Sequence, residues 1–314
     1  MTTMITGVGL VGTSFAQCAL KRNEKLVFYD FQPRTEYLHK KLGTADVAVV
    51  QKDVRDLPAL LEAIQTYRPE TVVHTAGLIG PRVAEALYSG LQINVMGTIN
   101  VLEAVRLAGV KRLVHISTFG VYDRRRLGDR PTHEDMPRGP GSAYGNSKAA
   151  KELMAEAYQK LYGFELIMLR LANAYGLGHF WAGSGGGEKV QNLLEAGIKG
   201  GVARIPQEQT MDFEYVYAKD VGRAVDIAAT IAMPKPSIFN IGAGKVTTFD
   251  ELAATAQKLL PKLEVEIVPG KPPANAVSQP LDISRAKEHL GWEPQYDMEK
   301  GFQDYISDLE KVMR

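Results

Sequence analysis

The chain has 314 residues, 45% hydrophobic and 23% charged, a composition that argues against a disordered chain, a collagen-like fibre or a coiled coil. Lys and Arg number 37 and Asp and Glu 36, so the net charge gives no sign of a nucleic-acid or acidic-membrane partner. The single cysteine, Cys18, excludes an internal disulfide and a multi-cysteine metal site. The length allows one large domain or two modest ones.

The beginning of the chain gives no targeting signal. It runs directly into a short apolar strand and a glycine turn, without the charged region or cleavage site of a signal peptide. No window approaches the roughly 18 to 20 unbroken apolar residues of a membrane helix. We therefore expect a cytoplasmic protein with no membrane partner.

Short β-rich segments alternate with helical patterns through the first half, a rhythm typical of a parallel sheet covered on both faces. The expected strands are 2–6, 25–29, 47–51, 71–75, 112–117 and 164–171. The expected helices are 11–22, 35–42, 57–67, 93–108 and 144–161. These crossovers predict an α/β fold, a doubly wound parallel sheet of the Rossmann type, which binds ligands beyond the carboxyl ends of its strands.

A glycine turn follows the first expected strand. Residues 7–12 read Gly-Val-Gly-Leu-Val-Gly, which fits G-x-G-x-x-G between a strand and a helix. Such glycines allow a tight turn and close backbone approach, so that a pyrophosphate can rest on free N–H groups at the helix N-terminus. The residues assigned to this turn are Gly7, Gly9, Leu10, Val11 and Gly12.

Asp30 ends the second expected strand, 18 residues after Gly12. A carboxylate at this place can hold the ribose 2′-hydroxyl and would repel a 2′-phosphate. The two features together predict a dinucleotide site that prefers NAD, although the nearby Arg34 leaves NADP open.

A hydroxyl, a phenol and an amine form the second candidate constellation. Tyr144 and Lys148 are four residues apart in an expected helix and share one face. A lysine cation near a phenol lowers its pKa, which would make Tyr144 a usable acid or base. Thr118, just past the fifth strand, is placed to hydrogen-bond the substrate oxygen that exchanges the proton.

The order and spacing of several motifs resemble the extended short-chain dehydrogenase/reductases, the NAD-dependent epimerase/dehydratase family. The resemblance covers nearly the whole chain. Besides the glycine turn, it includes the motifs at 53–56, 74–77, 94–98, 116–122, 144–148, 170–176, 212–216 and 290–292.

The resemblance implies that Tyr144 is the acid/base, Lys148 its electrostatic partner and Thr118 the substrate-orienting hydroxyl. For Asn94 it leaves two roles open. Asn94 either supports the sheet or a water molecule near Lys148, or it has a packing role. The further cofactor-binding residues it implies are Asp53, Val54, Thr75, Ala76, Gly77, Asn94, Tyr144, Lys148 and Leu171. The implied substrate-binding residues are Thr118, Phe119, Tyr144 and Asn173.

The chain departs from the family pattern at two places that affect the substrate. Met211 stands where relatives acting on nucleotide sugars commonly have an arginine that contacts the diphosphate. Phe119-Gly120 stands where the family's dehydratases have an Asp-Glu pair, which argues against sugar 4,6-dehydration. The run Arg124–Arg126 is either a solvated loop or a clamp for an anionic substrate.

Two domains are expected. We assign residues 1–175 to an NAD-binding domain, with a returning segment near 212–240, and residues 176–211 and 241–314 to a substrate-binding domain. The glycine-rich segment 183–187 is either a hinge for a lid or a flexible connector. Apolar residues on more than one face of helices 93–108 and 144–161, together with the family resemblance, suggest a homodimer.

The leading hypothesis is an NAD-dependent enzyme that moves hydride between nicotinamide and a secondary alcohol of a sugar-like or polyol small molecule. Two reactions stay open. One is epimerisation, and the alternative is net dehydrogenation of a small polar substrate that is not a nucleotide sugar. A non-catalytic dinucleotide sensor is the hypothesis from another class. The six histidines are not at metal-ligand spacings, so no metal site is expected.

Overall fold

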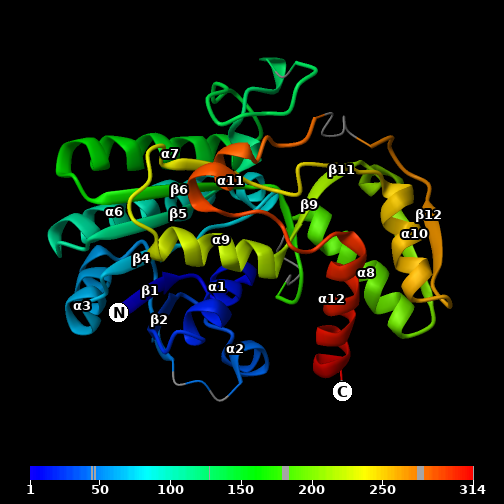
Figure 1. The fold of residues 1–314 in the computed structure, drawn as a ribbon, viewed down its shortest axis with the longest axis horizontal. Coiled ribbons are helices and arrows are strands. Elements are labelled where there is room, and N and C mark those ends of the chain that lie inside the picture. The colour runs from blue at the N-terminus through cyan, green and yellow to red at the C-terminus, as the bar shows by residue number, and fades with distance from the viewer. Residues whose placement is uncertain (44, 46, 127, 179–183, 274–278, 314) are drawn as a thin grey trace.

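The computed structural model describes residues 1–43, 45, 47–126, 128–178, 184–273 and 279–313. Its centre is a seven-stranded sheet in the order β10-β6-β5-β4-β1-β2-β3, with every neighbouring pair parallel (Figure 1). The strands are β1 (Thr2–Thr6), β2 (Lys25–Asp30), β3 (Ala48–Gln51), β4 (Thr71–His74), β5 (Arg112–Thr118), β6 (Glu165–Leu171) and β10 (Ile238–Ile241). The expected Rossmann-type α/β fold is confirmed.

The seventh strand, β10, lies outside the six that the sequence predicted. It pairs parallel to β6, with Ile238 opposite Met168 and Ile241 opposite Leu171. It lies well beyond residue 171, where the predicted alternation of strands and helices ends, and its pairing with β6 identifies it.

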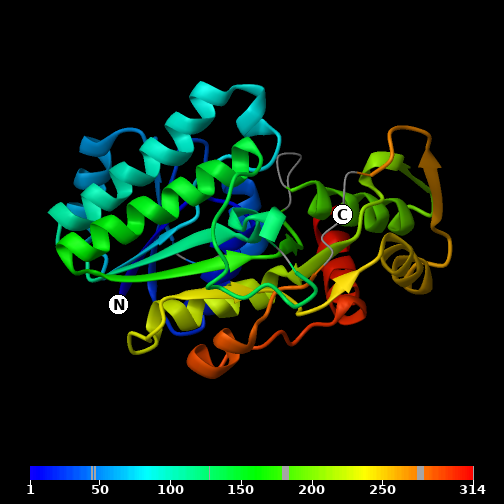
Figure 2. The ribbon, with the colours of Figure 1, turned by 90° about the horizontal axis from the view of Figure 1, so that it is seen from above.

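Helices cover both faces of the sheet (Figures 1 and 2). Helices α3, α6 and α7 pack on one face, and α1 and α9 on the other, with α2 beside α1. Their bounds are α1 (Leu10–Leu20), α2 (Thr35–Leu42), α3 (Leu57–Tyr67), α6 (Gly97–Leu107), α7 (Ala143–Tyr162) and α9 (Ala218–Thr230). The short helices α4 (Arg82–Glu85) and α5 (Leu87–Leu91) precede a π-helical turn (Gln92–Met96), so the expected helix 93–108 begins irregularly.

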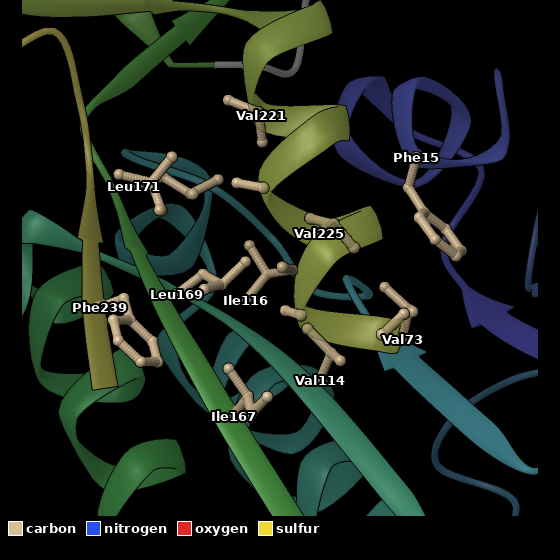
Figure 3. Close-up of a cluster of buried hydrophobic side chains, with 14 of the residues drawn as sticks. Phe15, Val73, Val114, Ile116, Ile167, Leu169, Leu171, Val221, Val225 and Phe239 are labelled. Atoms are coloured by element: carbon tan, nitrogen blue, oxygen red, sulfur yellow. The ribbon is translucent and has the colours of Figure 1, made fainter. Parts of the chain in front are cut away.

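Alternating side chains of the buried strands fill two separate cores. On β6, Ile167 and Leu169 belong to the core under α9, whereas Leu166 and Met168 belong to the core under α7. Figure 3 shows Val225 of α9 on the first of these sides. The continuous apolar run of β6 is therefore buried on both faces, as a central parallel strand requires.

A second group of elements follows β6. Strands β7 (Asn173–Tyr175), β9 (Phe213–Tyr217) and β11 (Val246–Thr247) form one small sheet, and β8 (Val202–Pro206) and β12 (Glu264–Val268) another. Around their shared core lie α8 (Gly185–Ile198), α10 (Phe249–Leu259) and α12 (Met298–Met313). Helix α11 (Ser284–Leu290) and Trp292 instead pack in the core under α9. The exact division into domains stays a prediction.

The sequence predicted that the chain has no membrane helix and that it forms a homodimer. No helix in the described part of the chain is long and apolar enough to cross a membrane. Leu107 of α6 and Leu153, Met154 and Leu161 of α7 are all exposed apolar side chains. The homodimer expected through these helices stays a prediction.

Helices α1 and α9 touch backbone to backbone at Gly222. A Cβ at this residue would overlap the Ser14 carbonyl group and lie 3.1 Å from the Phe15 nitrogen. Because α1 begins at the glycine turn, this contact fixes where the turn lies on the sheet.

Gly222→Ala should therefore lower the free energy of unfolding by about 1–3 kcal/mol, because a methyl group must push the two helices apart. Gly201→Ala is the matched control: its Cβ would meet only the Ala196 carbonyl oxygen, at 3.7 Å, and its effect should stay within about 0.5 kcal/mol. Denaturant unfolding measures both. Equal stability of the two variants would contradict the close contact.

Candidate active site

One cavity of about 810 Å³ lies beyond the carboxyl ends of β1, β2, β4, β5 and β6. It is lined by every predicted cofactor and substrate residue except Gly12. The predicted residues it brings together are Gly7, Gly9, Leu10, Val11, Asp30, Asp53, Val54, Thr75, Ala76, Gly77, Asn94, Thr118, Phe119, Tyr144, Lys148, Leu171 and Asn173. Loops that follow separate strands thus form one continuous site, as the fold class predicts.

The three glycines of the turn serve different purposes. Gly7 has a φ of +97°, and a Cβ there would lie 2.6 Å from Thr75 Oγ1, so both conformation and space require glycine. A Cβ at Gly12 would lie 2.7 Å from the Gly7 carbonyl oxygen, which makes Gly12 a packing residue below the cavity. At Gly9 a Cβ would meet no atom within 4 Å. Gly9 therefore leaves open space at the N-terminus of α1, where a phosphate can approach the backbone.

Asp30 holds the glycine turn against the end of β2. Its carboxylate accepts hydrogen bonds from the backbone N–H groups of Val8 (2.6 Å) and Gln32 (2.7 Å). The side chain lines the cavity and is half-buried. Asp30 is therefore ordered before any ligand arrives, as a receptor for a ribose hydroxyl should be.

The Asp30 end of the cavity also contains Asp53 and Val54. Arg55 binds the Asp53 carboxylate through Nε and Nη2 (2.6 Å for the latter) and lowers the pKa of Asp53. The exposed Phe31 lines the same end. Phe31 directly follows Asp30 in the sequence, and that position is the signal that could have identified it.

Asn94 lies in the π-helical turn and joins the loop after β4 to α7. Its amide accepts from the Leu78 N–H (2.7 Å) and donates to the Leu78 carbonyl (3.1 Å) and to Ser147 Oγ (3.0 Å). These contacts occupy the amide with protein groups. Of the roles left open by the sequence, they favour packing.

Lys151 is a cavity residue that the sequence reasoning missed. It is buried, and its Nζ donates to the Ala76 carbonyl at 3.2 Å. Burial, together with the neighbouring Lys148, lowers the pKa of Lys151. Its spacing of three residues from Lys148 and seven from Tyr144 on one helix could have identified it.

Tyr144 and Thr118 meet where α7 approaches the end of β5. The Thr118 hydroxyl acts on the Tyr144 phenol and lowers its pKa, and Thr118 Oγ1 accepts from the Gly120 N–H at 3.2 Å. A Cβ at Gly145 would lie 2.5 Å from the Gly120 carbonyl oxygen, so glycine allows the first turn of α7 to come this close. The predicted trio is completed by Lys148, whose Nζ donates to the Ile116 carbonyl at 2.5 Å.

The expected lowering of the pKa of Tyr144 is wrong for this structure. Burial raises the pKa of Tyr144 to about 12, and the Thr118 hydroxyl only partly opposes this. The Lys148 ammonium is directed to the Ile116 carbonyl, and burial lowers the pKa of Lys148 to about 8. Desolvation is the largest cause of both shifts, and the smaller opposing contributions come from Thr118 for Tyr144 and from Glu152 for Lys148.

Glu152 anchors α7 one turn beyond Lys148. Its buried carboxylate accepts from Arg170 Nε (3.0 Å) and Nη2 (2.7 Å) on β6, and from the hydroxyl of Ser117 on β5. Arg138, in the loop before α7, binds the same carboxylate. This buried network joins the helix of Tyr144 to the strand of Thr118.

The structure places the remaining predicted residues partly inside and partly outside the cavity. Arg124 lines the cavity, whereas Arg125 and Arg126 bind Asp123. Met211 does not line the cavity, and Phe213 does. In the glycine-rich segment, 185–187 form the first turn of α8, and Gly183 lies outside the described residues.

Comparison with known proteins gives the site a family. A model of the NAD-dependent epimerase/dehydratase family matches residues 3–242. The chain is 31% identical over 309 residues to a UDP-glucose 4-epimerase of Mycolicibacterium smegmatis, with 96% of each chain covered. The chain belongs to the NAD-dependent epimerase/dehydratase family. It is an enzyme of the extended short-chain dehydrogenase/reductase type.

Solved structures of this family have the same fold. A UDP-glucose 4-epimerase of Thermotoga maritima with UDP-glucose superimposes with a TM-score of 0.86 at 25% identity, over 100% of both chains. The UDP-glucose 4-epimerase of Thermus thermophilus in complex with NAD gives 0.83 at 26% identity, over 99% of each chain. NAD is the cofactor of this family member, and the open space at Gly9 and the ordered Asp30 carboxylate fit it.

Gly9→Val tests that fit. Gly9 has an extended backbone (φ −109°, ψ −172°) and free space at Cβ, so the fold accepts valine and loses about 1 kcal/mol of stability or less, as an N-cap residue. The side chain fills the phosphate approach and should raise the Kd of NAD at least about tenfold, measured by calorimetry.

Gly7→Ala is the contrasting variant for this experiment. Its positive φ and the 2.6 Å approach to Thr75 predict a loss of fold stability as well as of NAD binding. Unchanged NAD affinity in Gly9→Val would contradict the assignment of the turn.

Proposed function

We propose that this chain is an oxidoreductase/epimerase that transfers hydride between NAD and a secondary alcohol of a sugar-like or polyol substrate. The observation that carries the proposal is that Thr118, Tyr144 and Lys148 line the same cavity as the cofactor turn. Family membership supports it, because relatives with the same motifs include epimerases and dehydratases.

Tyr144 exchanges the proton of the reacting substrate oxygen, and Thr118 orients that oxygen by a second hydrogen bond. A pKa of about 12 keeps the phenol protonated near neutral pH, ready to donate to a ketone. Oxidation of an alcohol requires the phenolate. NAD supplies the hydride acceptor when bound, and its oxidised ring adds a positive charge that favours the phenolate.

Lys148 serves as the positioning cation of the pair. Its Nζ donates to the Ile116 carbonyl, and both residues line the cavity with Tyr144. A lysine with a pKa near 8 is largely charged at neutral pH, so it can donate to a cofactor ribose hydroxyl as well. Its ammonium also favours the anionic form of the nearby phenol.

Two reaction outcomes use this chemistry. A ketone that turns over and receives hydride on its other face gives the epimer, whereas a ketone that leaves gives net dehydrogenation. NAD(H) that survives dialysis of the purified protein would favour an epimerase, which recycles its cofactor. The similarity to UDP-glucose 4-epimerases favours this outcome. The neutral Met211 favours a smaller substrate and therefore the alternative dehydrogenase.

A non-catalytic dinucleotide sensor is the alternative of another class. A sensor needs the glycine turn and Asp30 but has no use for a phenol, a hydroxyl and a lysine in the same cavity. Thr118, Tyr144 and Lys148 all line the cavity, which favours catalysis.

Tyr144→Phe should lower kcat by about 100- to 10,000-fold, because the proton donor and acceptor is lost, and should leave the Kd of NAD within about twofold. The matched control is Tyr158→Phe, on the same helix but outside the cavity, which should keep full activity. Because the pKa of Tyr144 lies far above neutrality, wild-type kcat/KM for alcohol oxidation should rise with pH through the neutral range. Full turnover by Tyr144→Phe would refute the assignment.

A further inference from the structure

The three consecutive arginines after β5 do not share one environment. Asp123 is buried and binds Arg125 through Nη2 (2.8 Å) and Arg126 through Nε (3.7 Å). Arg124, by contrast, lines the active-site cavity. The structure records no acidic partner for Arg124 among the described residues. One guanidinium of the run thus faces the cavity while the other two neutralise Asp123.

Backbone pairing places Arg124 at the Tyr144 end of the cavity. The Asp123 N–H donates to the Pro137 carbonyl (2.9 Å), and the Gly139 N–H donates to the Val121 carbonyl (3.1 Å). The segment with Val121 and Asp123 follows Thr118 at the end of β5, and the segment with Pro137 and Gly139 leads into α7, whose first turn contains Tyr144. In Figure 1 the connection between β5 and α7 rises at the top of the view, beyond the sheet. Arg124 therefore belongs to the paired connection between the strand that ends at Thr118 and the helix that contains Tyr144, and it lines the same cavity as both.

The charges in the cavity are unevenly distributed. Its acidic residues, among those described, are Asp30 and Asp53, and both belong to the glycine-turn end, where Asp53 is paired with Arg55. The end formed by Thr118–Gly120, Tyr144 and Asn173 contains Arg124 without a carboxylate. This end has a positive potential and attracts an anion.

Asn173 adds a second observation. It is buried, lines the cavity, and its Nδ2 has no hydrogen-bond partner among the described residues. Its side-chain carbonyl faces Gly186, where a Cβ would lie 3.1 Å from Oδ1. A buried donor without an acceptor is unfavourable unless a ligand satisfies it. A ligand at the substrate end should therefore supply a hydrogen-bond acceptor for this amide, and an anion has several acceptor oxygens.

We infer that Arg124 binds a carboxylate of the substrate, so that the enzyme acts on a small sugar acid rather than on a neutral polyol or a nucleotide diphosphate sugar. This inference rests on the proposed function, because it names the substrate class of the same cavity. A guanidinium matches a carboxylate through two parallel N–H···O bonds, which fix the orientation of the substrate as well as its affinity.

The other cations near this end are not available for a diphosphate. Met211 is neutral, and Lys189 is buried with its Nζ donating to the carbonyls of Gln209 (2.7 Å) and Met211 (3.0 Å). Lys189 does not line the cavity.

Of the described cations that line the cavity, Lys148 and Lys151 donate to the carbonyls of Ile116 and Ala76, and Arg34 and Arg55 belong to the glycine-turn end. Arg124 is therefore the cation directed to the substrate, and one guanidinium matches one carboxylate, whereas a diphosphate carries at least two negative charges.

The experiment compares acids with neutral counterparts of the same carbon chain. Gluconate and glucuronate are tested against glucitol and glucose, with UDP-glucose as the diphosphate probe, by NAD-linked turnover and by calorimetric binding to the NAD-loaded protein. We expect wild type to prefer an acid to its neutral counterpart. Arg124→Met should raise the KM and Kd of that acid about 10- to 100-fold with a smaller change in kcat, and Arg124→Lys should lie between.

Arg126→Met is the matched control, because Arg126 belongs to the same run but lies outside the cavity. It should leave the affinity for the acid unchanged. Binding to the Tyr144→Phe protein separates the proposed reaction from the proposed carboxylate site. An acid whose binding to this variant depends on Arg124, but which wild type does not turn over, refutes the proposed reaction and supports the carboxylate site at Arg124. Three results would each overturn the sugar-acid assignment. Neither acid binds, or the acid binds Arg124→Met and wild type with equal affinity, or UDP-glucose alone binds in a way that depends on Arg124.

Discussion

The buried carboxylate of Glu152 is the interaction on which the catalytic geometry depends. It binds Arg170 of β6, Ser117 of β5 and Arg138 of the preceding loop, and so fixes α7 against two strands at once. Removing one partner of a buried ion pair leaves an uncompensated charge, at a cost of about 3–5 kcal/mol. Because Tyr144 lies two turns earlier on the same helix, its meeting with Thr118 follows from this anchorage.

The two ends of the cavity differ in how completely the protein satisfies their polar groups. The glycine-turn end is ordered in advance: Asp30 binds the Val8 N–H, and Thr75 Oγ1 donates to the Thr6 carbonyl at 2.7 Å. Among the described residues, the substrate end has no hydrogen-bond partner for the Asn173 amide nitrogen and no acidic partner for the Arg124 guanidinium. A preformed cofactor end beside an incompletely satisfied substrate end suits an enzyme that binds one cofactor and selects its substrate by charge.

Local patterns determined how much could be predicted from sequence. The glycine turn and Asp30 were found because a tight turn after a strand leaves a fixed spacing, and the trio of Thr118, Tyr144 and Lys148 because the helix and strand periods place them. The pKa of Tyr144 was predicted in the wrong direction, because desolvation depends on packing that a sequence does not show. The division of the arginine run likewise required the position of the buried Asp123. Strand β10 was missed because it lies beyond the predicted alternation of strands and helices, and its pairing with β6 identifies it.

The central claim is that Tyr144 is the proton-exchanging group, held protonated by burial and shifted toward the phenolate by the oxidised cofactor. The most direct measurement is the ultraviolet difference titration of the phenol, wild type minus Tyr144→Phe, in the empty protein and in complexes with NAD and NADH. We predict a pKa of about 12 in the empty protein, a lower pKa with NAD, and a smaller decrease with NADH, whose ring is uncharged. A Tyr144 pKa that is the same in all three states would contradict the account.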